Sequence, residues 1–268
     1  MPDQTIEKKI LYEQAEILKK EYAELFESKN HMLMYEEVLL RSIYLTSIGN
    51  DQYRLFSSEC ELAIIKQKIQ LAQAFFTKNE LPNWKEIDAN IEKQFAEWQI
   101  KIAKDTANIA NARIYLKSGL LSDEAAEKLK NAYKWLVEWL HPDLHPIQTN
   151  KEKELFISVQ AAYDMCDIRT LTEILQQLKE QCFEVNHDLS DPKAYVQKLS
   201  EMNKVLRLKI NKLDKSFPFS HRDLLYDKEW ISSQQQKIEN QIVQIRNEIQ
   251  EEAQHLLLLQ SWKPQLYN

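Results

Sequence analysis

The scarcity of glycine constrains this chain more than any other feature. Only Gly49 and Gly119 occur in its 268 residues, together with seven prolines. The tight turns of β-hairpins depend on glycine, because their central residues adopt positive φ angles. The abundant Glu, Lys, Gln, Leu and Ile also favour helix or are compatible with it. The sequence therefore predicts an all-α fold, and its apolar fraction of 44% is enough for a core.

Charge and cysteine usage exclude several classes of protein. The net charge of −6 argues against general nucleic-acid binding, which requires a basic face. No apolar run approaches the ~20 residues that span a bilayer, and the N-terminus carries no apolar signal segment. The odd number of widely spaced cysteines, Cys60, Cys166 and Cys182, is typical of a reducing cytosol. We expect a cytoplasmic protein with no nucleic-acid partner and no membrane span.

The first part of the chain, residues 1–114, is predicted to be an N-terminal arm of helical hairpins. Apolar residues recur at helical spacing, and the predicted helices cover residues 5–28, 31–48, 51–78 and 84–116. We expect Gly49 to end the second helix in a left-handed cap. The third and fourth helices are predicted to pack as an antiparallel hairpin.

A helix that stops at a proline occupies the middle of the chain. Ser122 is a good N-cap, and the helix that follows carries one apolar stripe. The stripe consists of Ala126, Leu129, Ala132, Tyr133, Leu136, Val137 and Leu140. Pro142 cannot continue the helix and disfavours the helical conformation of His141. We therefore expect His141 and Asp143 to lie at an exposed tip.

A second amphipathic helix is predicted over residues 151–166. Its apolar stripe comprises Leu155, Phe156, Val159, Ala162, Tyr163 and Cys166. Two such helices joined by a loop of about ten residues pack naturally as an antiparallel hairpin. This hairpin would present the tripeptide His141-Pro142-Asp143 at one end.

These residues carry a resemblance to the J domain of the DnaJ family of co-chaperones. The matching positions are Ala132-Tyr133-Lys134, Leu136, His141-Pro142-Asp143, Phe156, Val159 and Ala162-Tyr163. The resemblance covers residues 115–174, and we assign residues 115–184 to a J-domain-like unit. The short first helix of the family is suggested only by residues 115–120.

The resemblance implies a specific activity. A J domain docks on a DnaK-type ATPase chaperone and stimulates ATP hydrolysis through its His-Pro-Asp tip. Carried over to this sequence, the resemblance makes His141, Pro142 and Asp143 the stimulating tip. Lys130 and Lys134 would be the remainder of the family's basic docking face.

The sequence also departs from the family pattern. Between Leu121 and Leu140 there are three lysines and four acidic residues, so the helix before the tip is not basic. Trp135 and Trp139 stand where the family often has cations, and they fit either packing against neighbouring helices or an exposed binding patch. The glycine-rich linker and cysteine-rich zinc module of full DnaJ proteins have no counterpart. The simpler alternative is that the tripeptide is a solvated turn after a proline-terminated helix.

The last part of the chain, residues 185–268, is predicted to form a coiled-coil hairpin. Asp167 is expected to cap a helix over residues 168–182, and residues 185–192 read as a linker. Two helices follow, over residues 193–215 and 227–262, with apolar spacings of three, four and seven. They could pair with each other, and such arms could also form a homo-oligomer. The alternative is that both stripes pack as core within one domain.

Other chemistry has little support, so we expect neither an enzyme nor a cofactor. His141 and His145 both precede prolines in a loop, which is not a metal-ligand pattern. Two isolated glycines cannot form a phosphate-binding loop. The sequence therefore predicts a J-domain-like co-chaperone with a DnaK-type partner and an unknown client or assembly protein. The alternative is a non-catalytic interaction scaffold with a divergent J-like fold.

Overall fold

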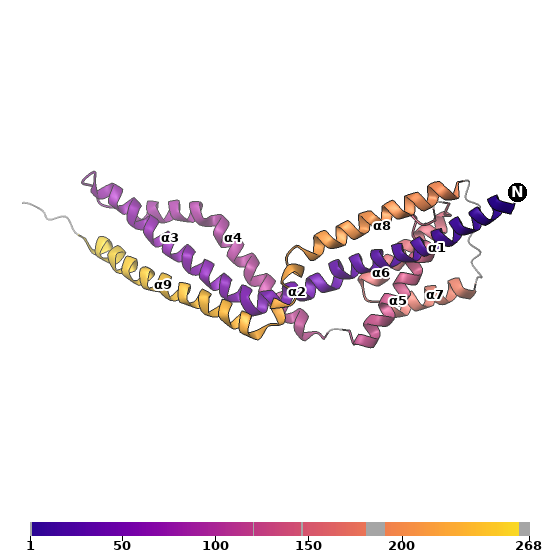
Figure 1. Ribbon diagram of the computed structural model, residues 1–268. Helices are drawn as coiled ribbons and strands as arrows, with labels where there is room; N and C mark the ends of the chain where they lie inside the picture. Colours follow the sequence, from indigo (N-terminus) through magenta and orange to yellow (C-terminus); the bar gives the residue numbers. More distant parts are fainter. Residues whose placement is uncertain (1, 120, 146, 181–190, 263–268) are drawn as a thin grey trace, which may run out of the picture. The chain divides into compact units, whose positions relative to one another are not determined.

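The computed structural model describes residues 2–119, 121–145, 147–180 and 191–262, and it confirms the all-α prediction (Figure 1). All regular structure in these ranges is helical, and none of the described helices is long and apolar enough to cross a membrane. The α-helices are α1 (Pro2–His31), α2 (Glu37–Tyr44), α3 (Asn50–Phe76), α4 (Trp84–Lys117), α5 (Asp123–Leu140), α6 (Asn150–Asp164), α7 (Ile168–Glu180), α8 (Pro192–Asp214) and α9 (Lys228–Ser261).

The chain folds into two compact units that do not follow the predicted order of three consecutive domains. Unit 1 consists of residues 1–39 and 119–221, and unit 2 consists of residues 40–118 and 222–268. Each unit joins segments that are far apart in the sequence. The predicted division assumed that neighbouring helices pair locally, whereas α1 packs on α8 and α3 packs on α9.

The helical backbone runs without a break from Pro2 to Phe76, so the predicted ends near residue 30 and at Gly49 were wrong. Two π-helical turns, η1 (Met32–Glu36) and η2 (Leu45–Gly49), replace the expected interruptions. Gly49 is buried with a φ of −60°, and a Cβ there would lie 3.1 Å from Leu45 Cδ2. Its small size therefore serves close packing inside a helix rather than a left-handed cap.

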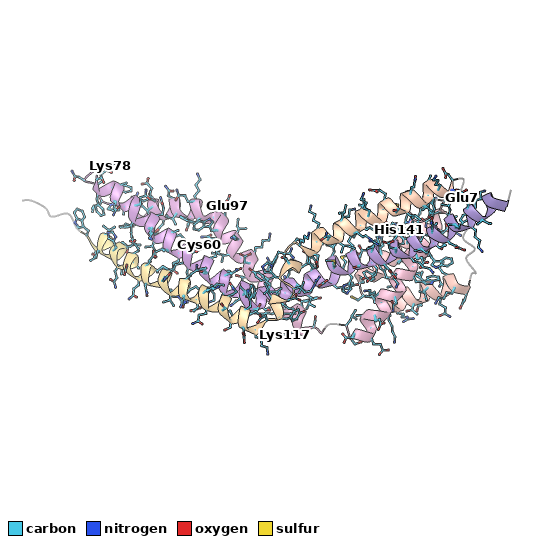
Figure 2. The ribbon with its side chains drawn as sticks, viewed as in Figure 1. Glu7, Cys60, Lys78, Glu97, Lys117 and His141 are labelled. Atoms are coloured by element: carbon cyan, nitrogen blue, oxygen red, sulfur yellow. The ribbon has the colours of Figure 1, made fainter. Side chains whose placement is uncertain are left out.

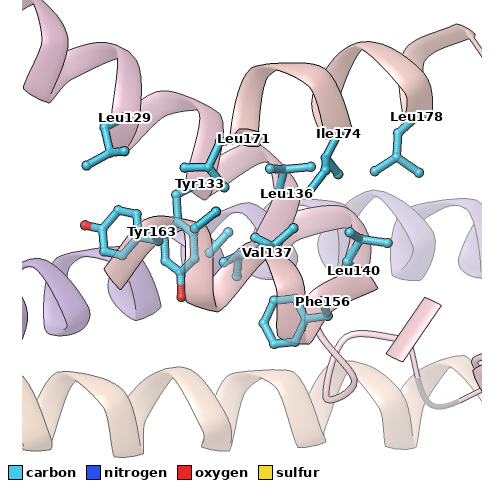
Figure 3. Close-up of a cluster of buried hydrophobic side chains, with 13 residues drawn as sticks. Leu129, Tyr133, Leu136, Val137, Leu140, Phe156, Tyr163, Leu171, Ile174 and Leu178 are labelled. Carbon is cyan, nitrogen blue, oxygen red and sulfur yellow. The ribbon is translucent and has the colours of Figure 1, made fainter. Parts of the chain in front are cut away.

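In unit 1, helices α5, α6 and α7 pack together as a three-helix core. The predicted caps hold, because Ser122 Oγ accepts from the Ala125 N–H at 3.3 Å and Asp167 Oδ1 accepts from the Thr170 N–H at 3.0 Å. The side chains that fill this core come from all three helices (Figure 3). Its buried members on these helices are Leu129, Tyr133, Leu136, Val137, Leu140, Phe156, Val159, Ala162, Tyr163, Leu171, Ile174 and Leu178.

Helices α1 and α8 complete unit 1, and α1 contacts both α8 and α5. A second buried cluster joins them to the loop after α5, and it contains Ala15, Tyr22, Leu144, Tyr195, Leu199 and Leu206. The predicted pairing of the 193–215 and 227–262 helices as a coiled-coil hairpin is therefore wrong. The apolar stripe of α8 packs on α1 within unit 1 and that of α9 packs on α3 within unit 2, so both stripes are core but not within one domain as the alternative had it. The proposed linker lies largely outside the described residues.

Unit 2 is built on α3, which contacts α4 through one set of residues and α9 through another. The predicted hairpin of the third and fourth helices is confirmed, with Ala72, Ile87 and Ile91 buried between α3 and α4. The α9 stripe packs on α3 and η2, where Ile48, Ile238 and Ile242 are buried. Residues 115–120 were suggested as the J domain's first helix, and residues 115–117 of this segment form the last turn of α4.

Candidate functional site

The tripeptide lies in the connection between α5 and α6, where the sequence placed it. α5 ends at Leu140, and His141 takes an extended conformation with φ −68° and ψ 127°, as expected before proline. The His141 carbonyl then accepts from the N–H groups of Leu144 and His145, at 2.9 and 3.1 Å. These bonds turn the chain sharply and fix the tripeptide relative to the end of α5.

Polar side chains from the loop satisfy the last carbonyl groups of α5. The Gln148 amide donates to the Leu140 carbonyl at 2.7 Å, and His145 Nε2 lies 2.8 Å from the Glu138 carbonyl. Helix ends leave such carbonyls without partners in the helix itself, so these contacts stabilise the junction. The Thr149–Glu152 capping box then begins α6.

The packing direction of α5 and α6 follows from two ring contacts. Tyr133 stacks on Tyr163 with ring centroids 3.8 Å apart, and His141 meets Phe156 edge-on at 5.0 Å. The later residue on α5 contacts the earlier residue on α6, so the two helices are antiparallel. The hairpin and its tripeptide connection match the sequence prediction.

The exposure predicted for His141 was wrong. Its side chain is buried, with the residue only 8% exposed, while Asp143 remains largely exposed. The imidazole lies edge-on to Tyr22 and Phe26 of α1, with centroid separations of 5.0 and 4.5 Å. Figure 2 marks His141 beside α1. The sequence gave no sign that residues more than a hundred positions earlier would cover this turn.

A chain of hydrogen bonds joins the tripeptide to α1. The Asp143 N–H donates to His141 Nδ1 at 3.1 Å, so Nδ1 is an acceptor and the proton of the neutral ring is assigned to Nε2. Nε2 lies 3.4 Å from the Tyr22 hydroxyl, which donates to Asp143 Oδ2 at 3.0 Å. A protonated imidazole would place a second N–H against the Asp143 amide. The geometry therefore favours neutral His141.

The protonation equilibria agree with this geometry. Burial lowers the pKa of His141 to about 4, although the Asp143 carboxylate raises it, and Lys29 and His145 lower it further. Burial also lowers the pKa of His145, which the hydrogen bond to the Glu138 carbonyl partly offsets. Burial and the nearby Asp143 raise the pKa of Tyr22, so its hydroxyl stays a donor.

The two lysines predicted as a docking face are paired with α1. Lys130 Nζ lies 3.6 Å from Glu27 Oε2, and Lys134 Nζ lies 3.5 Å from Glu24 Oε1. Both lysines remain partly exposed, whereas the Glu27 side chain is almost completely buried. Lys130 and Lys134 are therefore matched by glutamates one turn apart on α1.

Glu27 is the functional candidate that sequence reasoning missed. The Tyr163 hydroxyl donates to Glu27 Oε1 at 3.2 Å, and burial raises the pKa of Glu27 although Lys130 and His31 lower it. A glutamate within a helical stripe could have suggested a buried partner. Its spacing alone did not identify Lys130 or Tyr163.

Further polar contacts extend the same interface. Asn30 donates its amide N–H to the Tyr133 hydroxyl at 2.8 Å, and the Tyr35 hydroxyl donates to the Tyr163 carbonyl. From the other side, the Tyr195 hydroxyl of α8 donates to the Leu144 carbonyl at 2.6 Å. The tripeptide loop is thus held by α1 and α8 together.

The two tryptophans of α5 belong to packing rather than to a free aromatic patch. Trp135 and Trp139 stack on each other with centroids 5.1 Å apart, and both contact the edge of the three-helix core. Lys179 of α7 lies 5.5 Å above the Trp135 ring. This supports the packing interpretation of the pair.

Comparisons with known proteins add no assignment, because no family model, curated protein or solved structure matches this chain. Among the described residues, no group of three or more His, Cys, Asp and Glu side chains could hold a metal ion. The functional interpretation therefore depends on the tripeptide, the hairpin that carries it and the helices that cover it.

Proposed function

We propose that this chain is a J-domain-like co-chaperone that recruits a DnaK-type ATPase chaperone and stimulates its ATP hydrolysis. His141, Pro142 and Asp143 act at the contact, and Lys130 and Lys134 assist docking. One observation carries the proposal. The tripeptide lies at the connection of an antiparallel helix pair whose buried residues include Tyr133, Leu136, Phe156, Val159, Ala162 and Tyr163, all positions of the J-domain resemblance.

Specific core contacts support this assignment. In the resemblance, Tyr133 of the first helix and Tyr163 of the second are characteristic positions, and here their rings stack at the centre of the hairpin. Phe156 likewise packs beside the tripeptide through its contact with His141. A solvated turn that happened to contain these three residues would not require this register.

Single-turnover ATP hydrolysis by a purified DnaK-type chaperone from the same cell tests the proposal. The full chain should raise the rate, and Asp143→Asn should reduce it to that of the chaperone alone. Asn keeps an acceptor for Tyr22, and Asp143 is largely exposed, so the fold should survive. The exposed Asp223→Asn in unit 2 is the matched control. Equal stimulation by native protein and Asp143→Asn would contradict a tripeptide-dependent mechanism.

A second candidate, an interaction scaffold with a retained J-like fold, is favoured by the burial of His141. In this alternative the tripeptide only shapes the turn, and function depends on association of the long helices. Sedimentation and pull-down with the full chain distinguish it. A monomer that retains no partner would count against the scaffold.

A further inference from the structure

We propose that α1 is a built-in cover for the His141 side chain of the tripeptide, of which Pro142 and Asp143 stay exposed. In this closed form α1 encloses the imidazole and pairs with both docking lysines, and α1 must leave α5 before His141 can contact a partner. The inference rests on the proposed co-chaperone function and adds its regulation. It predicts that segments of the same chain compete with the chaperone for one surface.

The cover occupies the polar side chains assigned to docking. Tyr22 contacts both His141 and Asp143, while Glu24 and Glu27 face the two lysines of α5. No partner can use the His141 imidazole while the rings of α1 enclose it. The occlusion therefore concerns the functional candidates themselves rather than a neighbouring surface.

The interface between α1 and the α5–α6 hairpin is polar, as is typical of interfaces that form and dissociate. Tyr22, Glu27 and Asn30 of α1 all make polar contacts with α5, α6 or the loop between them. Interfaces that form and dissociate carry more such polar contacts than permanent cores do. Burying the Glu27 carboxylate also opposes closure, because its desolvation offsets part of the attraction to Lys130.

The three-helix core has most of its apolar contacts without α1. Among the buried members of its cluster, Ala23 alone comes from α1, and the others belong to α5, α6 and α7. Phe26 and Tyr35 pack on its edge and are only partly buried. Departure of α1 from α5 would leave most of the packing of the three-helix core in place and would separate Ala15 and Tyr22 from Leu144 in the second buried cluster.

A chain that is mostly closed should bind its partner with an apparent affinity reduced by the fraction that is open. Loosening α1 should then lower the concentration needed for half-maximal ATPase stimulation, without changing the maximal rate. Glu24→Lys combined with Tyr22→Phe would reverse one ion pair and remove the hydroxyl between His141 and Asp143. We expect a decrease of about tenfold in the half-maximal concentration.

The matched control is Glu13→Lys, which makes the same charge change at an exposed position of α1. It should leave the half-maximal concentration unchanged. If the control and the loosened variant shift equally, general electrostatics rather than uncovering would explain the effect.

A reversible lock tests the closed form directly in the full chain. Lys20→Cys of α1 and Glu138→Cys of α5 place thiols at two positions whose charges interact and which are not assigned to docking, after Cys60, Cys166 and Cys182 have been changed to serine. A short bis-maleimide linker with a reducible bond then joins α1 to α5. The cross-linked protein should not stimulate ATP hydrolysis, and reduction of the linker should restore stimulation.

The outcomes separate the two proposals. Stimulation by the cross-linked protein as strong as by the reduced protein would overturn the cover and leave the co-chaperone function standing. Absence of stimulation by the loosened variant, with hydrogen exchange showing the tripeptide loop uncovered, would overturn the function and its regulation together. Loss on locking with recovery on reduction would support both.

Discussion

The packing of α1 on α5 in unit 1 and the packing of α3 on α9 in unit 2 use different chemistry. At the first interface, the buried or half-buried groups include a carboxylate, an imidazole and several tyrosine hydroxyls. At the second, the buried residues of the cluster are Ile48 of η2 with Ile238 and Ile242 of α9, and the charged pairs lie at the exposed edges. The two long helical pairings therefore differ in what their separation would expose.

The difference indicates different roles for the two interfaces. Unit 2 buries isoleucines against isoleucines, which is the ordinary way to stabilise a helix pair. In unit 1, polar side chains of α1 pack on the α5 surface that a J-domain-like protein would need for its partner. Matched changes in the two interfaces should therefore have unequal effects on stability.

Charge reversal should distinguish the stabilities of the two interfaces most clearly. Glu27→Lys places an unpaired buried cation beside Lys130 and should lower the free energy of unfolding of unit 1 by about 3–5 kcal/mol. Glu248→Lys reverses an exposed pair with Lys66 in unit 2 and should cost about 1 kcal/mol or less. Urea unfolding of both variants measures this contrast, and equal losses would remove the distinction.

Acid should weaken unit 1 through His141. Its pKa is about 4 in the folded protein and about 6.5 when unfolded, so the unfolded state binds more protons between these values. Stability should thus fall as pH drops from about 6.5 to about 4, by up to about 3 kcal/mol.

The same pH range contains an opposing contribution. Burial raises the pKa of Glu27 and of Glu138, so their contribution to stability increases as pH falls. Phenylalanine cannot titrate, so the difference in the free energy of unfolding between the native protein and His141→Phe isolates the contribution of the histidine. Unfolding measured across this pH range in both proteins should show that the free energy of unfolding falls more steeply with decreasing pH in the native chain. Parallel curves would contradict the burial of His141.

Single hydroxyl groups should have intermediate effects. Tyr22→Phe removes the bonds between α1 and the tripeptide, and Tyr195→Phe removes the bond from α8 to the Leu144 carbonyl. Each should lower the free energy of unfolding by about 1 kcal/mol. Thermal unfolding of the two variants would show whether α1 and α8 hold the loop equally.

Exposed ion pairs should contribute least to stability in both units. Double-mutant cycles on Glu24 with Lys134, and on Lys66 with Glu248, should give coupling energies of about 0.2–1 kcal/mol. A much larger value for the first pair would indicate that α1 is held by electrostatics rather than by the tyrosines and Glu27.

Local sequence signals predicted the elements near the tripeptide well. The capping residues Ser122 and Asp167, the stop at Pro142 and the hairpin around them all act over short distances along the chain. The break between α3 and α4 was also predicted, because Pro82 and Asn83 lie within it. Periodicity and capping are local properties, which a sequence displays directly.

Pairing between distant helices could not be predicted in the same way. The stripe of α8 would fit any complementary stripe, so its spacing did not distinguish α9 from α1. The cover over His141 depends on such a distant pairing, and its burial was missed for that reason. Gly49 was misread because the same residue type suits a cap and a crowded helix surface.

Titration of the histidine ring signals by nuclear magnetic resonance tests the central claim most directly. In the full chain, the His141 imidazole should remain neutral with its proton on Nε2 and should titrate with a pKa of about 4. That result would show the His141 ring held beneath α1, as the closed form requires. A His141 pKa near the free value of about 6.5 would mean that the ring is exposed to water, and it would contradict the cover.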